Sequence, residues 1–257
     1  MFSLFSDFFA CRDNRLSRVD PRAKLVVAAT AILCVILSTN AILPVMVFVS
    51  SVAVMLTLRI PARLVALRLA APLGIVAVLA LLQSFTSGAT PLWTIPLGAW
   101  KLTATREGVH AAALTASRVC GAVSVVLLLS LVTPAHRIFH ALRWFCVPQG
   151  WVEIAMLMYR YTFTLLDLTA DLTAAQQLRM GYASAGRALS SMGAVCGTVI
   201  IRSVEQATRT HEAMVLRGYQ REIPFGPMLP LAAKDCCAVA LAATVLLALY
   251  VFIGRAR

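Results

Sequence analysis

Two pairs of potential metal-binding side chains lie one helical turn apart in the sequence. His136 and His140 have the i and i+4 spacing that can present two imidazoles to a divalent metal. No third or fourth ligand stands near them, so we predict a solvated helix face. Asp167 and Asp171 have the same spacing, and acidic pairs in membrane helices can hold magnesium for phosphate or diphosphate chemistry. A membrane transferase that uses these two carboxylates therefore stays open as an alternative.

Motifs for nucleotide or peptide hydrolysis are absent from the sequence. It contains no Walker A loop, no GxSxG nucleophile motif and no HExxH zinc motif. We therefore predict a non-enzymatic chain that holds no metal or cofactor of its own. Any energy that the protein uses must then come from a partner.

Two similar breaks in the second half each place an arginine at the end of a predicted helix, shortly before a glycine. One break contains Leu178, Arg179 and Gly181, and the other contains Leu216-Arg217-Gly218. A plain helix C-cap would explain either alone, because cations favour the negative end of the helix dipole and glycine favours the left-handed conformation. Their duplication, with an aromatic residue after each glycine, predicts two arginine knobs presented to one kind of partner.

The composition of the chain places these residues in a membrane protein. Of 257 residues, 60% are hydrophobic and 13% are charged, against about 45–50% and about 25% in soluble domains. The net charge of +12 comes from Lys and Arg residues spread between apolar stretches, which does not resemble a nucleic-acid-binding module. The seven cysteines lack CxxC spacing and are interpreted as small hydrophobic residues.

Uncharged runs predict about five membrane-spanning helices. No residue from Leu25 to Leu58 is charged, and at about 1.5 Å per residue this run is too long for one crossing of a layer about 30 Å thick. It must reverse direction near Ser38-Thr39-Asn40. The predicted spans are Leu25 to Ser38, Ala41 to Leu58, Leu69 to Phe85, about Val109 to Val132, and Cys236 to Gly254.

The segments between the spans predict an all-α protein with three parts. Thr86 to Trp100, rich in Gly, Pro and Trp, predicts an interfacial loop. Residues 134–234 predict a cytoplasmic set of amphipathic coupling helices between the fourth and fifth spans. The parts are therefore 1–133, with an N-terminal cytoplasmic segment and four spans, 134–234, and 235–257, with the fifth span.

The distribution of cations predicts the orientation. Of the 23 Lys and Arg residues, 18 lie before Leu25, between Arg59 and Arg68, or between Pro134 and Lys234. The positive-inside rule therefore places the N-terminus and the coupling region in the cytoplasm, and Arg257 outside. In the fourth span, Arg118 is expected to extend to the interface or to pair within the bundle.

Several motifs resemble the transmembrane T component of energy-coupling factor transporters, in the CbiQ branch that serves cobalt uptake. They extend over most of the chain: Asp20-Pro21-Arg22-Ala23-Lys24-Leu25, Val147-Pro148, Met158-Tyr159-Arg160-Tyr161, Leu178-Arg179-Met180-Gly181-Tyr182, Ile201-Arg202-Ser203-Val204-Glu205 and Arg217-Gly218-Tyr219.

The resemblance implies a non-catalytic, multi-pass subunit of the bacterial inner membrane. Its coupling helices would dock onto two ATPase subunits, which hold ATP and Mg²⁺, and a separate membrane subunit would capture the substrate. Docking would use Arg217 with Leu216 and Gly218, where leucine replaces the family's alanine, and Arg179 with Gly181, where one extra residue intervenes. Asp20, Pro21 and Lys24 match a signature whose mechanism the sequence does not reveal. Nickel or a vitamin stays open as the cargo beside cobalt.

Overall fold

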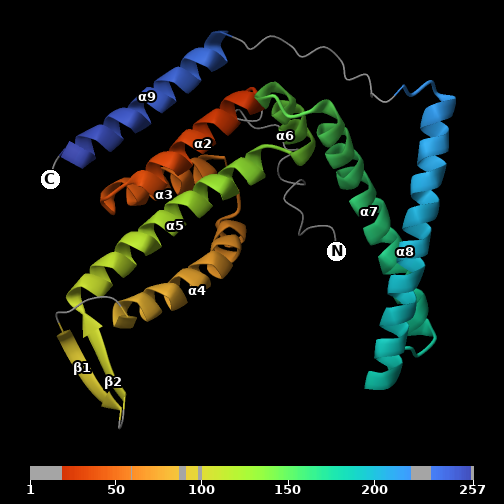
Figure 1. Cartoon of the computed structure of the whole chain (residues 1–257), viewed down its shortest axis with the longest axis horizontal. Helices are drawn as coiled ribbons and strands as arrows, with labels where there is room; N and C mark the ends of the chain where they lie inside the picture. The colour runs from red at the N-terminus through yellow and green to blue at the C-terminus, as the bar shows by residue number, and fades with distance from the viewer. Residues whose placement is uncertain (1–18, 59, 87–90, 98–99, 221–232, 256–257) are drawn as a thin grey trace. The chain divides into compact units, whose positions relative to one another are not determined.

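The computed structural model of the chain describes residues 19–58, 60–86, 91–97, 100–220 and 233–255. The chain forms two compact units, one of Met1–Ile138 with Pro230–Arg257 and the other of Phe139–Leu229. Figure 1 shows their elements in chain order. Most of the predicted N-terminal cytoplasmic segment (1–18) and part of the predicted coupling region (221–232) lie outside the described residues.

The first unit begins with two short helices, α2 (Pro21–Leu37) and α3 (Ile42–Thr57). Asp20 caps α2, because a side-chain oxygen accepts a hydrogen bond from the N–H of Arg22 at 3.4 Å. Pro21 stands in the first turn, where no N–H is needed. The chain reverses direction between Leu37 and Ile42, at the polar residues that the sequence analysis identified as a break.

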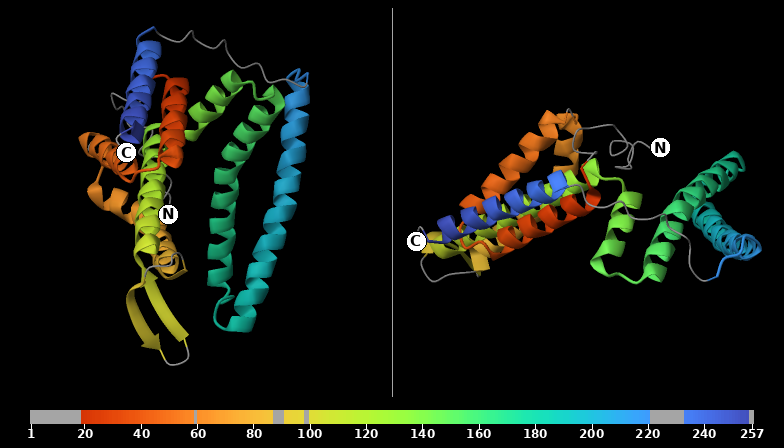
Figure 2. Two further views of the ribbon diagram at one scale, coloured as in Figure 1. Left: turned by 60° about the vertical axis from the view of Figure 1, so that its left-hand side comes forward. Right: turned by 90° about the horizontal axis from the view of Figure 1, so that it is seen from above.

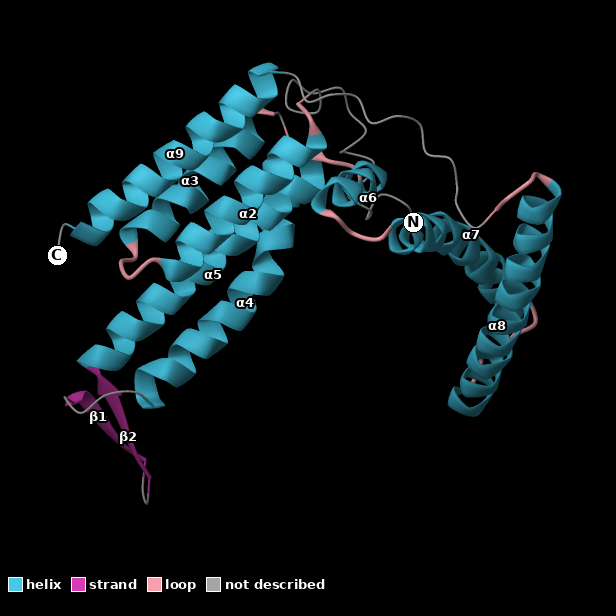
Figure 3. Cartoon of the chain, turned by 45° about the horizontal axis from the view of Figure 1, so that its top comes forward, coloured by secondary structure: helices cyan, strands magenta, loops and turns pink. Residues whose placement is uncertain are grey.

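Two longer helices follow, α4 (Ala62–Thr86) and α5 (Arg106–Val132). α4 begins earlier than the predicted span, so Arg63 lies on the helix and not in a turn. Between α4 and α5 the chain forms an antiparallel hairpin of β1 (Pro91–Leu97) and β2 (Trp100–Thr105), drawn in magenta in Figure 3. The Gly, Pro and Trp residues of this stretch predict an interfacial loop, and the structure shows paired strands instead. The β-branched and aromatic residues of this stretch favour the extended pairing that the structure shows.

α5 is the central helix of the first unit and packs against α2, α3 and α4. In a bilayer, where lipid tails are as apolar as leucine, such packing depends on close contact between small side chains. One core cluster joins α2, α3 and α5 through Ala28, Ala31, Cys34, Val35, Leu43, Val47 and Val125. A second joins the end of α3 with α4 and α5 through Met55, Ile60, Val65, Leu69 and Leu131.

Arg118, in the middle of α5, pairs within the bundle as expected. Its Nε donates to the carbonyl oxygen of Ser38 at 3.0 Å, and its Nη2 donates to the same oxygen. Ser38 caps the C-terminus of α2 and is 3% exposed. The arginine therefore satisfies a buried carbonyl at the end of one helix from the side of another.

The last helix, α9 (Ala233–Arg255), packs mainly on α2, far away in the sequence, as Figure 2 shows. Within the described residues, two helices are long and apolar enough to cross a bilayer, Ala62–Ser84 and Arg106–Val132. Two shorter helical stretches, Ile42–Thr57 and Cys237–Phe252, are also apolar. Large apolar side chains are exposed on α3, α4 and α9, which suits contact with lipid, among them Val49, Ile75, Leu82, Leu241 and Phe252.

The second unit contains two long helices, α7 (Gln149–Leu178) and α8 (Ala185–Leu216), which lie side by side in both views of Figure 2. They follow the short helix α6 (Ala135–Leu142), which crosses the boundary between the units. The sequence predicts one amphipathic helix between Pro134 and Pro148, whereas the α-helix ends at Leu142 and a 3-10 turn, Arg143–Phe145, follows it. Phe139 of α6 contacts Tyr159 of α7 edge to face, with ring centroids 5.9 Å apart. The described part of the chain is thus helical apart from the hairpin.

Candidate functional site

The two arginine-bearing breaks of the sequence form the turns that end α7 and α8. Arg179 is the C-cap residue of α7 and Arg217 is the C-cap residue of α8. In each turn, two backbone hydrogen bonds close the helix in the Schellman pattern, one spanning six residues and one spanning four inside it. They are Gly181 N to Gln176 O (2.9 Å) with Met180 N to Gln177 O (3.0 Å), and Tyr219 N to Met214 O (3.0 Å) with Gly218 N to Val215 O (2.9 Å).

The two arginines therefore occupy the same position in two copies of one backbone motif. The residue after each arginine takes the left-handed conformation, with φ of 81° at Gly218 and 56° at Met180. Met180, and not Gly181, is thus the equivalent of Gly218. The extra residue between Arg179 and Gly181 that the sequence comparison identified is no departure in the geometry of the turn.

Gly181 is required for a different reason. A Cβ atom on this residue would lie 2.9 Å from the carbonyl oxygen of Gln176 and in contact with the hydroxyl of Ser191 on α8. Its own carbonyl accepts a hydrogen bond from that hydroxyl at 3.1 Å. The glycine therefore allows a close approach between the turn after α7 and the first part of α8.

Both turns present the same pair of exposed side chains. Leu178 and Leu216, directly before the arginines, are each 88% exposed. Arg179 and Arg217 are also exposed, and neither has a hydrogen-bond or ion-pair partner in the part of the chain that the structure describes. Each turn thus offers one leucine and one unneutralised guanidinium.

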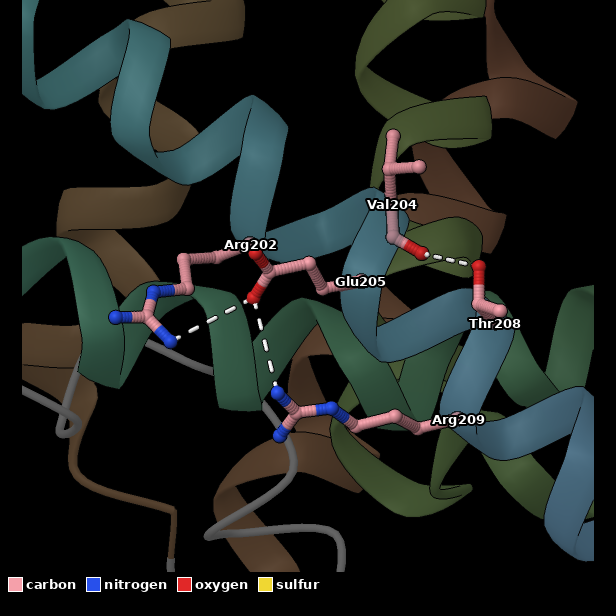
Figure 4. A network of polar contacts seen from close by, with 5 residues as sticks. All are labelled: Arg202, Val204, Glu205, Thr208 and Arg209. Atoms are coloured by element: carbon pink, nitrogen blue, oxygen red, sulfur yellow. Dashed lines mark hydrogen bonds and ion pairs between the residues drawn. The ribbon is translucent and has the colours of Figure 1, made fainter.

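Other arginines on α8 differ from Arg217 in this respect. Glu205 lies between Arg202 and Arg209, with N–O distances of 3.6 Å and 3.9 Å, as Figure 4 shows. Exposed pairs of this kind add little stability. Glu205 offsets one of these two positive charges. Arg179 and Arg217, in contrast, have no acidic partner within the described residues.

No sequence pattern identifies Glu153, which the structure places in contact with Tyr219, two residues after Arg217. This residue lies in the first part of α7 and is only 4% exposed. Its Oε2 accepts a hydrogen bond from the Tyr219 hydroxyl at 3.3 Å, and its Oε1 accepts one from the Gln149 amide at 3.0 Å. The aromatic residue that follows Gly218 is thus bonded to the opposite helix.

The signature residues Asp20, Pro21 and Lys24 lie at the start of α2. Besides capping that helix, Asp20 donates its backbone N–H to Oδ2 of Asp235 in the first turn of α9, at 3.2 Å. The signature therefore ties the starts of two helices together.

The remaining candidates do not come together as a site. His136 and His140 are exposed on α6, and Asp167 and Asp171 are exposed on α7. Among the described residues, no group of three or more His, Cys, Asp or Glu side chains could hold a metal ion. The transferase alternative gains no support from this arrangement.

Several known proteins are similar to this chain. An uncharacterised protein of Methanocaldococcus jannaschii is 26% identical over 211 residues, which cover 82% of this chain and 79% of that protein. The cobalt transport protein CbiQ of Rhodobacter capsulatus is 31% identical over 165 residues, which cover 64% of each chain. A putative fused cobalt transport protein CbiMQ of Methanocorpusculum labreanum is 28% identical over 123 residues, which cover 48% of this chain and 20% of that longer protein.

A family model gives the broadest match. The model described as CbiQ, cobalt transport protein, matches residues 12–224, which include α2 to α8, both arginine-bearing turns and the signature at Asp20. The apolar helices α4 and α5 agree with the membrane location of a transport protein. This chain belongs to the CbiQ family of cobalt transport proteins.

Proposed function

We propose that this chain is the transmembrane coupling subunit of an energy-coupling factor importer for cobalt. In this proposal the chain has no active site. Two partner ATPase subunits bind ATP and Mg²⁺. Movement of the ATPases passes through α7 and α8 to a separate membrane subunit that captures the metal. The description of the family supports cobalt as the cargo.

The proposal rests on the distance between the two arginine-bearing turns, which share one backbone geometry. α8 has 32 residues, and Arg179 and Arg217 lie beyond its two ends. At 1.5 Å per residue the helix is about 48 Å long. Such a span is far too great for one small pocket but suits one turn on each of two partner subunits. The shared geometry of the turns supports two copies of the same kind of partner.

The capture subunit and the membrane arrangement extend the proposal. The Methanocorpusculum relative is described as a fused CbiMQ protein, which supports a CbiM-type protein as the capture partner of this chain. We propose that α2, α3, α4, α5 and α9 are the five membrane helices, in the inner membrane, with the N-terminus and the second unit in the cytoplasm. The distribution of cations supports this orientation.

Co-purification with the ATPase subunits of the same organism tests the proposal. The full chain should retain both ATPases in detergent, and the double variant Arg179→Ala/Arg217→Ala should lose them. The matched control is Arg202→Ala/Arg209→Ala, which removes two cations from α8 that are both paired with Glu205. Equal recovery with both double variants would contradict docking through the helix ends.

A further inference from the structure

Each arginine-bearing turn is hydrogen-bonded to the opposite helix. The turn after α7 is held by α8, because the Ser191 hydroxyl donates to the carbonyl of Gly181 at 3.1 Å. The turn after α8 is held by α7, because the Tyr219 hydroxyl donates to Glu153 at 3.3 Å. Each long helix therefore fixes the turn that ends the other one.

These polar ties matter because the two helices share little apolar contact. A groove of about 520 Å³ lies between the first half of α7 and the second half of α8, lined on α7 by residues such as Leu157 and Leu165 and on α8 by Ala207 and Met214. Tyr161 bridges to Thr210 beside it, with the two oxygens 2.7 Å apart. Where apolar packing is sparse, directional hydrogen bonds decide how the ends of the helices are aligned.

Glu153 is well suited to such a role. With 4% of its surface exposed, it has almost no access to water and depends on protein donors. Both of its oxygens accept hydrogen bonds, one from Gln149 and one from Tyr219. Removing the Tyr219 hydroxyl would take one hydrogen bond from a buried carboxylate, which is costlier than losing an exposed bond.

Tyr219 connects this buried group to the arginine. The backbone N–H of Tyr219 donates to Met214 O, which is the six-residue hydrogen bond that closes the turn. Tyr219 directly follows Gly218, whose backbone is left-handed. A fixed tyrosine side chain therefore restrains the turn from which Arg217 extends. We propose that Glu153 and Tyr219 form a latch that positions Arg217 for docking to its partner, an inference that rests on the docking role proposed above.

The other turn provides a matched control. Tyr182 lies one position further along its turn than Tyr219, because Gly181 takes the place of Tyr219 in the backbone motif. Tyr182 is 37% exposed, and its hydroxyl makes no hydrogen bond within the described residues. Removing that hydroxyl should leave docking unchanged. A difference between Tyr219→Phe and Tyr182→Phe would thus report the latch and not the loss of a tyrosine.

The experiment measures the affinity of the purified full chain for the ATPase subunits in two backgrounds. In Arg179→Ala, where docking depends on Arg217, Tyr219→Phe should weaken binding roughly tenfold, the effect of one lost hydrogen bond to a charged group. In Arg217→Ala, Tyr219→Phe should have no further effect, because the latch acts through Arg217. Tyr182→Phe should change neither affinity.

Substitution of Glu153 gives a second, independent reading. Glu153→Gln keeps an oxygen that can accept the phenol bond, so it should retain most of the affinity that Glu153→Leu loses. Equal losses from Tyr219→Phe in both backgrounds, or no loss in either, would overturn the latch while the docking role stands. If the arginine substitutions themselves leave binding unchanged, the docking role fails first, and the latch fails with it.

Discussion

The Ser191 hydroxyl donates a hydrogen bond to the carbonyl oxygen of Gly181, across a close contact between the turn after α7 and helix α8. A Cβ on Gly181 would lie 2.9 Å from Gln176 O as well as against Ser191. We therefore expect Gly181→Ala to force the turn away from α8 and to cost about 1–3 kcal/mol of stability, as overpacking usually does.

Thermal unfolding of the purified protein in detergent measures this effect. Gly193→Ala is the control, because Gly193 lies inside α8 with nothing within 4 Å of an added Cβ. That substitution should leave stability unchanged or raise it by up to about 1 kcal/mol, since alanine is the better helix former. Equal responses of the two variants would refute the close approach.

A second prediction concerns the residue that follows each arginine. The left-handed conformation costs a residue with a Cβ about 1–2 kcal/mol, and glycine avoids this cost. Met180→Gly should therefore stabilise the turn after α7 by up to about 1 kcal/mol, and Gly218→Ala should destabilise the turn after α8 by about 1 kcal/mol. The two substitutions should change the free energy of unfolding in opposite directions. A change in the same direction would contradict the equivalence of the turns.

The same residues show how far the sequence could predict the structure. Charge-free runs and helix breakers located most of the helices, because these signals are local. The preference of glycine for the left-handed conformation predicts that Gly181 adopts it in the first turn. In the structure Gly181 instead lies against Ser191, and Met180 adopts the left-handed conformation. A contact between the turn and α8 decides which residue is left-handed, and no local sequence pattern indicates that contact.

Glu153 and the hairpin illustrate the same limit. A single Glu in an apolar run gives no indication that its partner is Tyr219, which lies 66 positions further along the chain. The strands Pro91–Leu97 and Trp100–Thr105 lie in a stretch whose Pro and Gly residues are typical of a loop. Their pairing is visible only in the register of the two segments. The candidate arginines could be identified because they stand at helix ends, where spacing is informative.

A third prediction tests the pairing of Arg118 inside the bundle. Arg118→Leu leaves the buried carbonyl of Ser38 without its donor, and we expect a loss of about 1–3 kcal/mol in the free energy of unfolding. Arg63→Leu is the matched control, because Arg63 is exposed at the start of α4. A similar, small effect of both variants on the unfolding temperature would show that the bond to Ser38 contributes nothing.

A fourth prediction concerns orientation. A cysteine at Gln177, exposed near the end of α7, should be protected from a membrane-impermeant thiol reagent in intact cells. A cysteine at Glu107, exposed in the first turn of α5, should react. Both are placed in a variant whose own cysteines are replaced. Labelling at position 177 without labelling at 107 would reverse the proposed topology.

The last prediction separates docking by Arg217 and Arg179 from simple helix capping. The planar guanidinium can hold a partner carboxylate with two hydrogen bonds, whereas lysine offers a point charge. Arg217→Lys should therefore impair ATP-driven uptake of radiolabelled Co²⁺ although it preserves the charge and the C-cap. Arg217→Ala should impair uptake more strongly, because losing one member of a buried interfacial charge pair typically costs about 2–5 kcal/mol.

The two sites should also reinforce each other. Because both turns belong to one connected pair of helices, binding at one end raises the effective concentration at the other, so a single substitution can spare assembly while the double one does not. Capping alone predicts a cost of about 1 kcal/mol or less for each arginine and additive effects on stability, with uptake unchanged by Arg217→Lys. Uptake and ATPase retention, measured for the two single variants and the double one, distinguish these outcomes. Full uptake by Arg217→Lys together with full retention by the double variant would leave the arginines as caps.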